Sequence, residues 1–228
     1  MNGTYSSTAP GLGCDQDTPQ PRIFDRRWLA AVKHLRCGRA ISDLVWDRIY
    51  PTKYAELSPV HWTPVSVARR AADLLSRGTQ TRVLDIGSGV GKFCVIAALT
   101  TPGLFVGVER RGEMVDVARQ TAHRAATSRT RFIHANANDI DWTNFNGFYL
   151  YNPFEELWRP DVRSVGPPGT ETTEYRSLVS FTQQCLVDSR PGTRVVTYHG
   201  FGGEMPSCFQ LTLLQPCGRD FLECWERE

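Results

Sequence analysis

The chain has 228 residues, of which 41% are hydrophobic and 11% aromatic, enough to bury the core of one catalytic domain. Its net charge of +2 is too small to indicate a nucleic-acid partner, although such a partner is not excluded. Seven cysteines occur without a C-x-x-C pair, which favours neither a disulfide framework nor a zinc site. No apolar run is long enough to span a membrane. We therefore expect a cytoplasmic protein without a metal or a membrane partner.

The N-terminal part divides into a tail and a helical extension. Residues 1–21 are rich in Gly, Ser, Thr and Pro and lack the features of a signal peptide, which predicts a disordered tail. Residues 22–58 carry two helical patterns and are predicted to form a cap on the main domain. The apolar positions are Phe24, Trp28, Val32 and Leu35, followed by Ile41, Leu44, Val45 and Ile49. The basic residues of this extension are expected to form a solvated helical face rather than an RNA-binding surface.

Residues 59–228 are predicted to form the main domain, in which strands and helices alternate. The expected strands cover 81–86, 104–108, 131–134, 147–152, 194–198, 209–214 and 221–225, and the expected helices cover 91–100, 112–127 and 172–188. The last two strands are expected to form an antiparallel hairpin. Alternation of this kind predicts a doubly wound, mainly parallel, seven-stranded sheet in a three-layer α/β/α arrangement. The Gly- and Pro-rich segment 160–170 is predicted to be a mobile loop beside the active site.

The segment 83–91, VLDIGSGVG, combines a short buried strand, an acidic residue and three glycines in one turn. A dinucleotide fingerprint would need glycine at position 92, where the chain has Lys92. The turn resembles the acidic-x-Gly-x-Gly-x-Gly motif of class I S-adenosylmethionine (AdoMet) methyltransferases. This resemblance implies that AdoMet binds here and leaves as S-adenosylhomocysteine. The residues carried over are Asp85, Gly87, Ser88, Gly89 and Gly91.

An acidic residue follows the second expected strand. Glu109 lies about 20 positions beyond the glycines, where βαβ nucleotide-binding units place a carboxylate for the ribose hydroxyls. The resembling methyltransferases place theirs in the same way, which implies a ribose site at Glu109 with Arg110 beside it. After the third strand, the resemblance implies an adenine site at Asn136 and Ala137, where the family usually has Asp-Ala. The Asn136 amide oxygen can accept the adenine N–H, and Asp139 is an alternative acceptor.

The fourth expected strand ends in Asn152-Pro153-Phe154. The carboxyl end of a central strand is where open α/β sheets place their active sites. The tripeptide resembles the [Asn/Asp]-Pro-Pro-[Tyr/Phe] motif of amino-methyltransferases, with one proline missing. The resemblance implies that the Asn152 side chain and the Pro153 carbonyl accept hydrogen bonds from a substrate amino group next to the cofactor, while Phe154 stacks on the substrate. In the alternative interpretation, Pro153 ends the strand and Phe154 seats the next helix.

Two further positions complete the candidate site. Thr63 is predicted to be the N-cap, and Pro64 the first residue, of a helix before the glycine turn. Many amino-methyltransferases carry Thr-Pro there, which implies contact with the methionine end of AdoMet; an ordinary capped helix is equally compatible. His199 follows the fifth strand and suits a general base or a substrate contact, or else a hydrogen-bonded loop histidine. The glycines after His199 suggest a flexible hinge.

Taken together, the motifs predict a class I methyltransferase with an antiparallel last strand, acting on an amino nitrogen. Three alternatives remain open. The first is transfer to oxygen, or to a small molecule, with a base such as His199. The second is a non-catalytic AdoMet-binding subunit, and the third is an NAD-dependent enzyme. The sequence selects neither the size of the amine-bearing substrate nor the oligomeric state.

Overall fold

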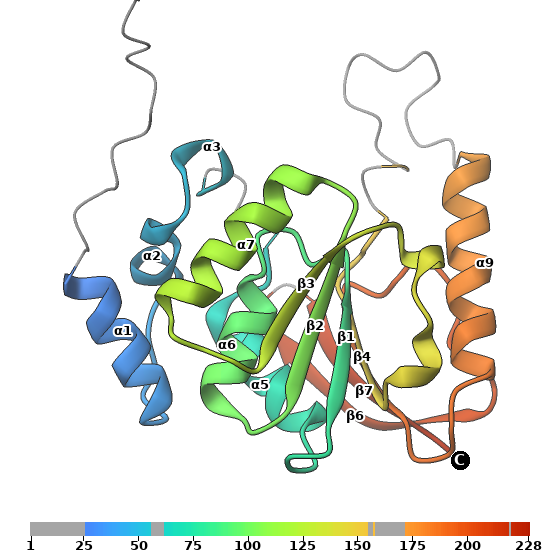
Figure 1. The fold of residues 1–228 in the computed structure, drawn as a ribbon. Helices are drawn as coiled ribbons and strands as arrows, with labels where there is room; N and C mark the ends of the chain where they lie inside the picture. Colours follow the sequence, from blue (N-terminus) through green and yellow to red (C-terminus); the bar gives the residue numbers. More distant parts are fainter. Residues whose placement is uncertain (1–25, 56–61, 155–156, 158–171, 219) are drawn as a thin grey trace, which may run out of the picture.

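The computed structural model describes residues 26–55, 62–154, 157, 172–218 and 220–228. One seven-stranded sheet forms its centre, with the strand order β3-β2-β1-β4-β5-β7-β6 (Figure 1). The strands are β1 (Arg82–Ile86), β2 (Leu104–Glu109), β3 (Thr130–His134), β4 (Gly147–Leu150), β5 (Arg194–Tyr198), β6 (Phe209–Cys217) and β7 (Asp220–Arg227). The predicted tail at 1–21 and the predicted loop at 160–170 lie outside the described residues.

The first five strands pair in parallel, and β7 runs antiparallel to both β5 and β6. The central strands β1, β4 and β5 are buried on both faces, which explains why their sequences are nearly continuous apolar runs rather than alternating ones. The predicted doubly wound sheet with an antiparallel last strand is therefore confirmed.

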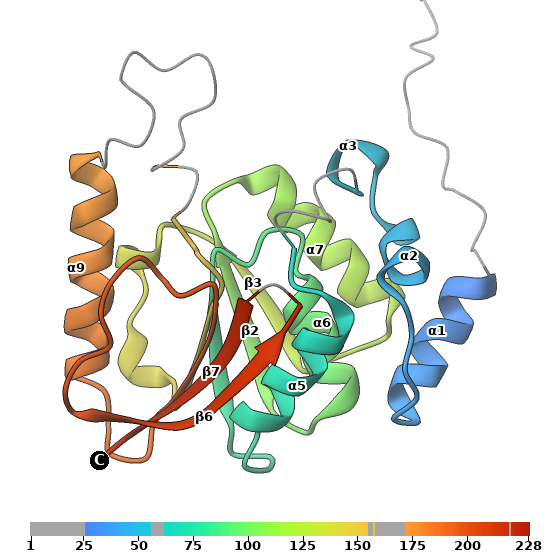
Figure 2. The same ribbon diagram turned by 180° about the vertical axis from the view of Figure 1, so that it is seen from behind.

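Helices cover both faces of the sheet (Figures 1 and 2). On one face lie α5 (Val65–Leu75), α6 (Lys92–Thr100) and α7 (Gly112–Arg124), and α1 (Arg26–Arg36) packs on the outside of α6. On the other face lie α9 (Thr173–Val187) and the short 3-10 turns η2 (Ala137–Asp139) and η3 (Trp142–Asn144). The predicted three-layer arrangement is confirmed. Within the described part of the chain, every helix is too short or too polar to cross a membrane.

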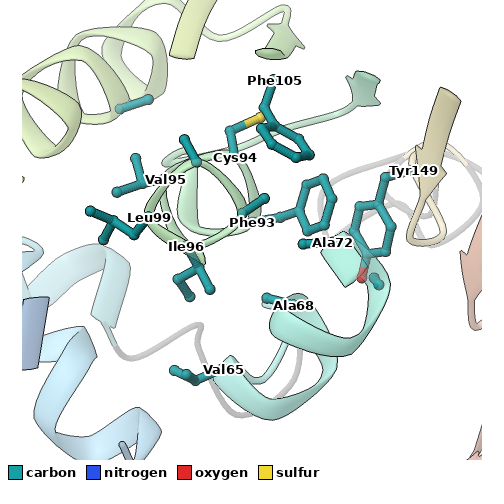
Figure 3. Packing of buried hydrophobic residues seen from close by; sticks show 14 of the residues in the cluster. Val65, Ala68, Ala72, Phe93, Cys94, Val95, Ile96, Leu99, Phe105 and Tyr149 are labelled. Carbon is teal, nitrogen blue, oxygen red and sulfur yellow. The ribbon is translucent and has the colours of Figure 1, made fainter. Parts of the chain in front are cut away.

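Helix α6 is buried on every side because it lies between the sheet and α1, α5 and α7. Figure 3 shows the aromatic contacts at its start. The Phe93 ring stacks on Tyr149 of β4 with a centroid distance of 3.9 Å, and it meets Phe105 of β2 edge to face at 5.9 Å. These contacts fix the first turn of α6, which follows directly on the glycine turn.

The N-terminal extension contains α1 and then α2 (Asp43–Trp46), η1 (Asp47–Ile49) and α3 (Thr52–Ala55). The first helical pattern is confirmed at its described positions, since Trp28, Val32 and Leu35 are buried, while Phe24 lies outside the described residues. The second is wrong in register: Leu44 is 74% exposed, and Trp46 is fully buried instead. The reason is that α2 has only one turn before the chain tightens into a 3-10 turn, so the 3.6-residue period does not continue.

Candidate active site

The candidate site lies where the winding of the sheet changes direction. From β1 the chain winds outward through β2 and β3, and from β4 it winds the opposite way through β5. Strands β1 and β4 are neighbours, with Ile86 opposite Leu150 at their carboxyl ends. Open α/β sheets bind ligands in the crevice outside such a switch point. The glycine turn follows β1 here and Asn152 follows β4, so the fold brings the two predicted motifs together.

The glycines of the turn have different roles. Gly87, Gly89 and Gly91 all have positive φ angles, of 71°, 53° and 76°. A Cβ on Gly89 would meet no atom within 4 Å, whereas one on Gly91 would lie 2.6 Å from the Phe132 ring. Gly91 is therefore required for packing on the protein's own core, and Gly89 borders open space that a ligand can approach. Ser88 turns its side chain toward β2, so it offers a ligand only its backbone.

Asp85 lies beneath the turn rather than at its surface. Its side chain is buried, and the Cys94 thiol of α6 donates to its Oδ2 at 3.3 Å. Burial raises the pKa of Asp85 to about 7, although the Cys94 hydrogen bond opposes this, and the nearby Glu109 adds to it. The geometry thus makes Asp85 a support between β1 and α6, with no face presented to a ligand.

Glu109 is the buried carboxylate at the end of β2, with 3% of its side chain exposed. The Gly89 N–H donates to Oε2 at 3.0 Å, and the Arg111 backbone N–H donates to Oε1 at 3.0 Å. The Arg111 guanidinium donates to both oxygens, at 2.9 and 3.4 Å. Because a carboxylate offers about four lone-pair positions, a ribose diol at Glu109 requires the Arg111 side chain to move. The sequence analysis did not predict a role for Arg111 and named only its neighbour Arg110.

The other two predicted cofactor contacts are less enclosed. Arg110 points toward the start of α9, where its guanidinium lies 3.6 Å from Glu174. Asn136 is exposed and begins η2, and both its backbone N–H and its side-chain amide donate to Asp139, at 3.3 and 3.2 Å. Ala137 is buried in the core. The two candidate adenine acceptors, Asn136 and Asp139, are therefore hydrogen-bonded to each other.

The predicted cap at Thr63 is wrong by one residue. Helix α5 begins at Val65, with Pro64 in the N-cap position and no side-chain cap from it. The buried Thr63 hydroxyl instead hydrogen-bonds the Tyr149 hydroxyl at 2.9 Å. Asp43 of the N-terminal extension supplies the cap, since its Oδ1 accepts from the Val65 N–H at 2.9 Å. Sequence pattern cannot reveal a cap that comes from a distant segment.

Lys92 connects the same extension to the glycine turn. Its side chain is 4% exposed, and its ammonium lies 2.6 Å from Asp43 Oδ1 and 2.8 Å from Asp47 Oδ1. In the sequence, Lys92 served only to exclude a dinucleotide fingerprint, which needs glycine at this position. The structure shows it as a buried cation held by two carboxylates of the N-terminal extension.

The segment after β4 departs from the strand predicted at 147–152, because β4 ends at Leu150. Asn152 has a φ of 39°, and its backbone N–H donates to the Gly200 carbonyl at 2.9 Å. Its half-buried side chain has no hydrogen-bond partner among the described residues. Phe154 is only 6% exposed and belongs to the same buried hydrophobic cluster as Tyr175 and Val179 of α9. This burial contradicts a stacking role for Phe154 and favours the alternative, in which its ring seats the chain after β4.

His199 lies at the corresponding position after β5, with a φ of 61°. Its Nδ1 pairs with the Asp220 carboxylate at the start of β7. The flexible hinge after it stays a prediction. Phe201 is buried, and a Cβ on Gly202 would collide with the Tyr175 hydroxyl, so this part of the loop packs closely against α9. The pairing of Asp220 with His199 could not be predicted from the sequence, because it depends on the insertion of β7 beside β5.

Comparisons with known proteins agree with this geometry. Residues 78–153 match a family described as a methyltransferase domain, and no curated protein matches the chain. A putative O-methyltransferase from Klebsiella pneumoniae is similar in structure, with a TM-score of 0.54 and 17% identity over 88% of this chain and 97% of that one. An RNA methyltransferase from Salinibacter ruber, in complex with S-adenosylhomocysteine, has a TM-score of 0.53 and 20% sequence identity, over 73% of this chain and 93% of that one. TrmN from Thermus thermophilus has a TM-score of 0.54 and 18% sequence identity, over 73% of this chain and 49% of that one.

The matched domain contains β1, the glycine turn, Glu109 and Asn152, so it covers most of the candidate site. The match to a methyltransferase domain covers residues 78–153, and together with the fold it supports a class I methyltransferase. AdoMet is the methyl donor of this class, and the residues present fit it. Gly89 borders open space at the switch point, and a buried carboxylate, Glu109, contacts the same turn.

Proposed function

We propose that this methyltransferase transfers the methyl group of AdoMet to an amino nitrogen held by the Asn152 side chain and the Pro153 carbonyl. One observation carries the proposal. A Cβ on Gly87 would lie 3.2 Å from the Pro153 carbonyl oxygen, so the proposed acceptor site directly adjoins the cofactor turn. The Asn152 amide, which has no hydrogen-bond partner within the described part of the chain, provides a second acceptor for a substrate N–H.

The cofactor contacts follow from the same geometry. Glu109 accepts the ribose hydroxyls, the backbone of residues 87–89 faces the nucleoside, and Asn136 or Asp139 accepts the adenine amino group. Thr63 and Pro64 border the methionine end. In this scheme residues 59–228 form the methyltransferase domain, and 22–58 form a cap joined to it through Lys92. Positioning of the nitrogen against the methyl carbon supplies much of the rate in an in-line displacement.

Transfer to an oxygen is the second candidate, because the pair formed by His199 and Asp220 adjoins the site and can remove a hydroxyl proton. One similar structure is of a putative O-methyltransferase. Two other similar structures are those of an RNA methyltransferase and of TrmN. Nucleobase amines therefore belong among the acceptors to be tested, beside side-chain amides and oxygen acceptors.

The test uses tritiated AdoMet with four acceptors: unmodified transcribed RNA, adenosine, cytidine and a glutamine-containing peptide. We expect wild-type protein to label an amine of at least one of them, and Asn152→Ala to lose that labelling while still binding AdoMet. Asn144→Ala, on an exposed turn, is the matched control. Near-normal turnover in Asn152→Ala, with label in a base-labile ester or a hydroxyl group, would instead favour transfer to oxygen.

A further inference from the structure

The segments after β4 and β5 form one structural unit. Asn152 and His199 each lie two residues beyond the paired positions Leu150 and Thr197. Both adopt left-handed backbone conformations, which are uncommon for residues other than glycine and concentrate at functional sites. The Asn152 N–H bond to Gly200 joins the two segments. His199 is therefore held beside the proposed acceptor site.

The imidazole of His199 is oriented from three sides. Its Nδ1 pairs with Oδ2 of Asp220. The Tyr151 ring stacks on it at 5.3 Å with an interplanar angle of 29°, and the Tyr198 ring lies 4.3 Å away. Tyr198 is itself fixed, because its hydroxyl donates to the Cys217 carbonyl at 3.1 Å. These contacts leave the ring little freedom to rotate.

Asp220 is also fixed, since its Oδ1 accepts from the Phe221 N–H at 2.7 Å. A carboxylate on Nδ1 keeps the imidazole proton on that nitrogen and leaves Nε2 as the acceptor. The other titratable groups against the ring are Tyr151 and Tyr198. Burial raises the pKa of Tyr198, with Cys217 and Asp220 adding to the effect, so its hydroxyl stays neutral. Asp220 is thus the charged group that His199 faces in the described structure.

We infer that Asp220 is a positioning residue that holds His199 so that Nε2 takes the proton released by the methyl acceptor. This inference rests on the proposed function. The lone pair of the acceptor nitrogen forms the new N–C bond while the C–S bond breaks, and its electron pair stays on sulfur. The methylated nitrogen then carries one surplus proton. That proton passes to Nε2 of His199 and from there to solvent.

The first measurement requires no acceptor. Long-range proton–nitrogen NMR of the imidazole in the full chain reports which ring nitrogen carries the proton. We expect the Nδ1–H tautomer of His199 in the wild type, and loss of that preference in Asp220→Asn. Asp188→Asn, which changes an exposed carboxylate at the C-terminal end of α9, is the matched control and retains the wild-type spectrum of His199. An Nε2–H tautomer in the wild type would overturn the inference.

The second measurement follows turnover with whichever acceptor is labelled. His199→Ala is expected to lower kcat by roughly 100-fold, and added imidazole should restore part of it because the side chain is partly exposed. Asp220→Asn should lower kcat without changing the KM for AdoMet. Asp220→Glu should recover part of kcat.

The outcomes separate the two proposals. Wild-type kcat in both His199→Ala and Asp220→Asn overturns the role of Asp220 and leaves the proposed function intact. If the wild type binds AdoMet but labels none of the four acceptors, the proposed function fails, and the NMR measurement alone decides whether Asp220 orients His199.

Discussion

Gly87 and Pro153 are neighbours across the switch point of the sheet, close enough that a side chain at Gly87 would touch Pro153. A Cβ on Gly87 would lie 3.2 Å from the Pro153 carbonyl oxygen and 3.4 Å from its Cα. Gly87 also has a left-handed φ of 71°. The turn that follows β1 therefore shares a boundary with the segment that follows β4, and a side chain at this position would displace the proposed acceptor carbonyl.

Gly87→Ala should reduce methyl transfer more than AdoMet binding, because the new methyl group presses on Pro153. We expect kcat to fall while the Kd for AdoMet, measured by calorimetry, changes less. Gly192→Ala is the matched control, because Gly192 has a φ of 79° with only the flexible Arg77 side chain nearby, at 3.8 Å. Both variants should lose about 1–2 kcal/mol of stability from left-handed strain. Equal turnover in the two variants would contradict the account.

Arg111 is expected to compete with the cofactor for Glu109. Arg111→Ala removes the two guanidinium donors and leaves the two backbone N–H bonds of the carboxylate in place. Two lone-pair positions then become available to the ribose hydroxyls. AdoMet should bind more tightly by roughly fivefold, or about 1 kcal/mol. Weaker binding, measured by calorimetry against Arg119→Ala as a surface control, would show that Arg111 supports the cofactor instead.

Asp85 should make stability depend on pH. Burial raises its pKa from the ordinary 3.8 to about 7, so the folded protein binds a proton that the unfolded chain has already lost. The stabilisation is complete below about pH 4 and is lost as the pH rises through about 7. Asp85→Asn is insensitive to this titration. Its free energy of unfolding relative to wild type should increase between pH 4 and 7, by up to about 4 kcal/mol for about three pKa units.

Urea unfolding of wild type and Asp85→Asn at several pH values gives this difference directly. A difference that is constant with pH would show that Asp85 is ionised in the folded protein. Other carboxyl groups, such as Glu226, whose pKa is lowered chiefly by its hydrogen bond with Arg77, affect both proteins equally and cancel.

The ion pairs of Lys92 should anchor the N-terminal extension. The double variant Asp43→Asn/Asp47→Asn keeps side-chain oxygens at both positions but leaves a buried ammonium without an anion. Removing the partners of a buried charge typically costs about 3–5 kcal/mol. We expect a loss of that order in urea unfolding, and adding Lys92→Met should restore most of it. An unchanged unfolding midpoint in the double variant would contradict the buried pairing.

The sheet was predictable because its strands are buried on both faces and therefore stand out as apolar runs. Glu109 was placed correctly at the end of β2 for the same reason, whereas Asn152 lies two residues beyond the end of β4. Asp43, Asp220 and Arg111 were not predictable as partners. Asp43 and Asp220 act on residues far away in the sequence, Val65 and His199, through contacts that exist only after the elements have packed.

Phe154 illustrates a different limit. Its place in a family-like motif suggested an exposed stacking ring, but the side chain fills the space between the sheet and α9. A sequence motif records residue types and spacing, and it does not record which face of the chain the core takes. The same holds for Gly91, because a side chain at this position would collide with the Phe132 ring of the protein's own core.

Calorimetric titration of the full chain with AdoMet tests the central claim most directly, with Glu109→Gln and Glu113→Gln measured in parallel. Glu113 is an exposed carboxylate that forms a surface ion pair with Lys53 at 3.1 Å and serves as the matched control. The account predicts micromolar binding to the wild type and to Glu113→Gln, and at least about tenfold weaker binding to Glu109→Gln, since the ribose hydroxyls lose a charged acceptor. Absence of AdoMet binding to the wild type, or equal binding to all three proteins, would contradict it.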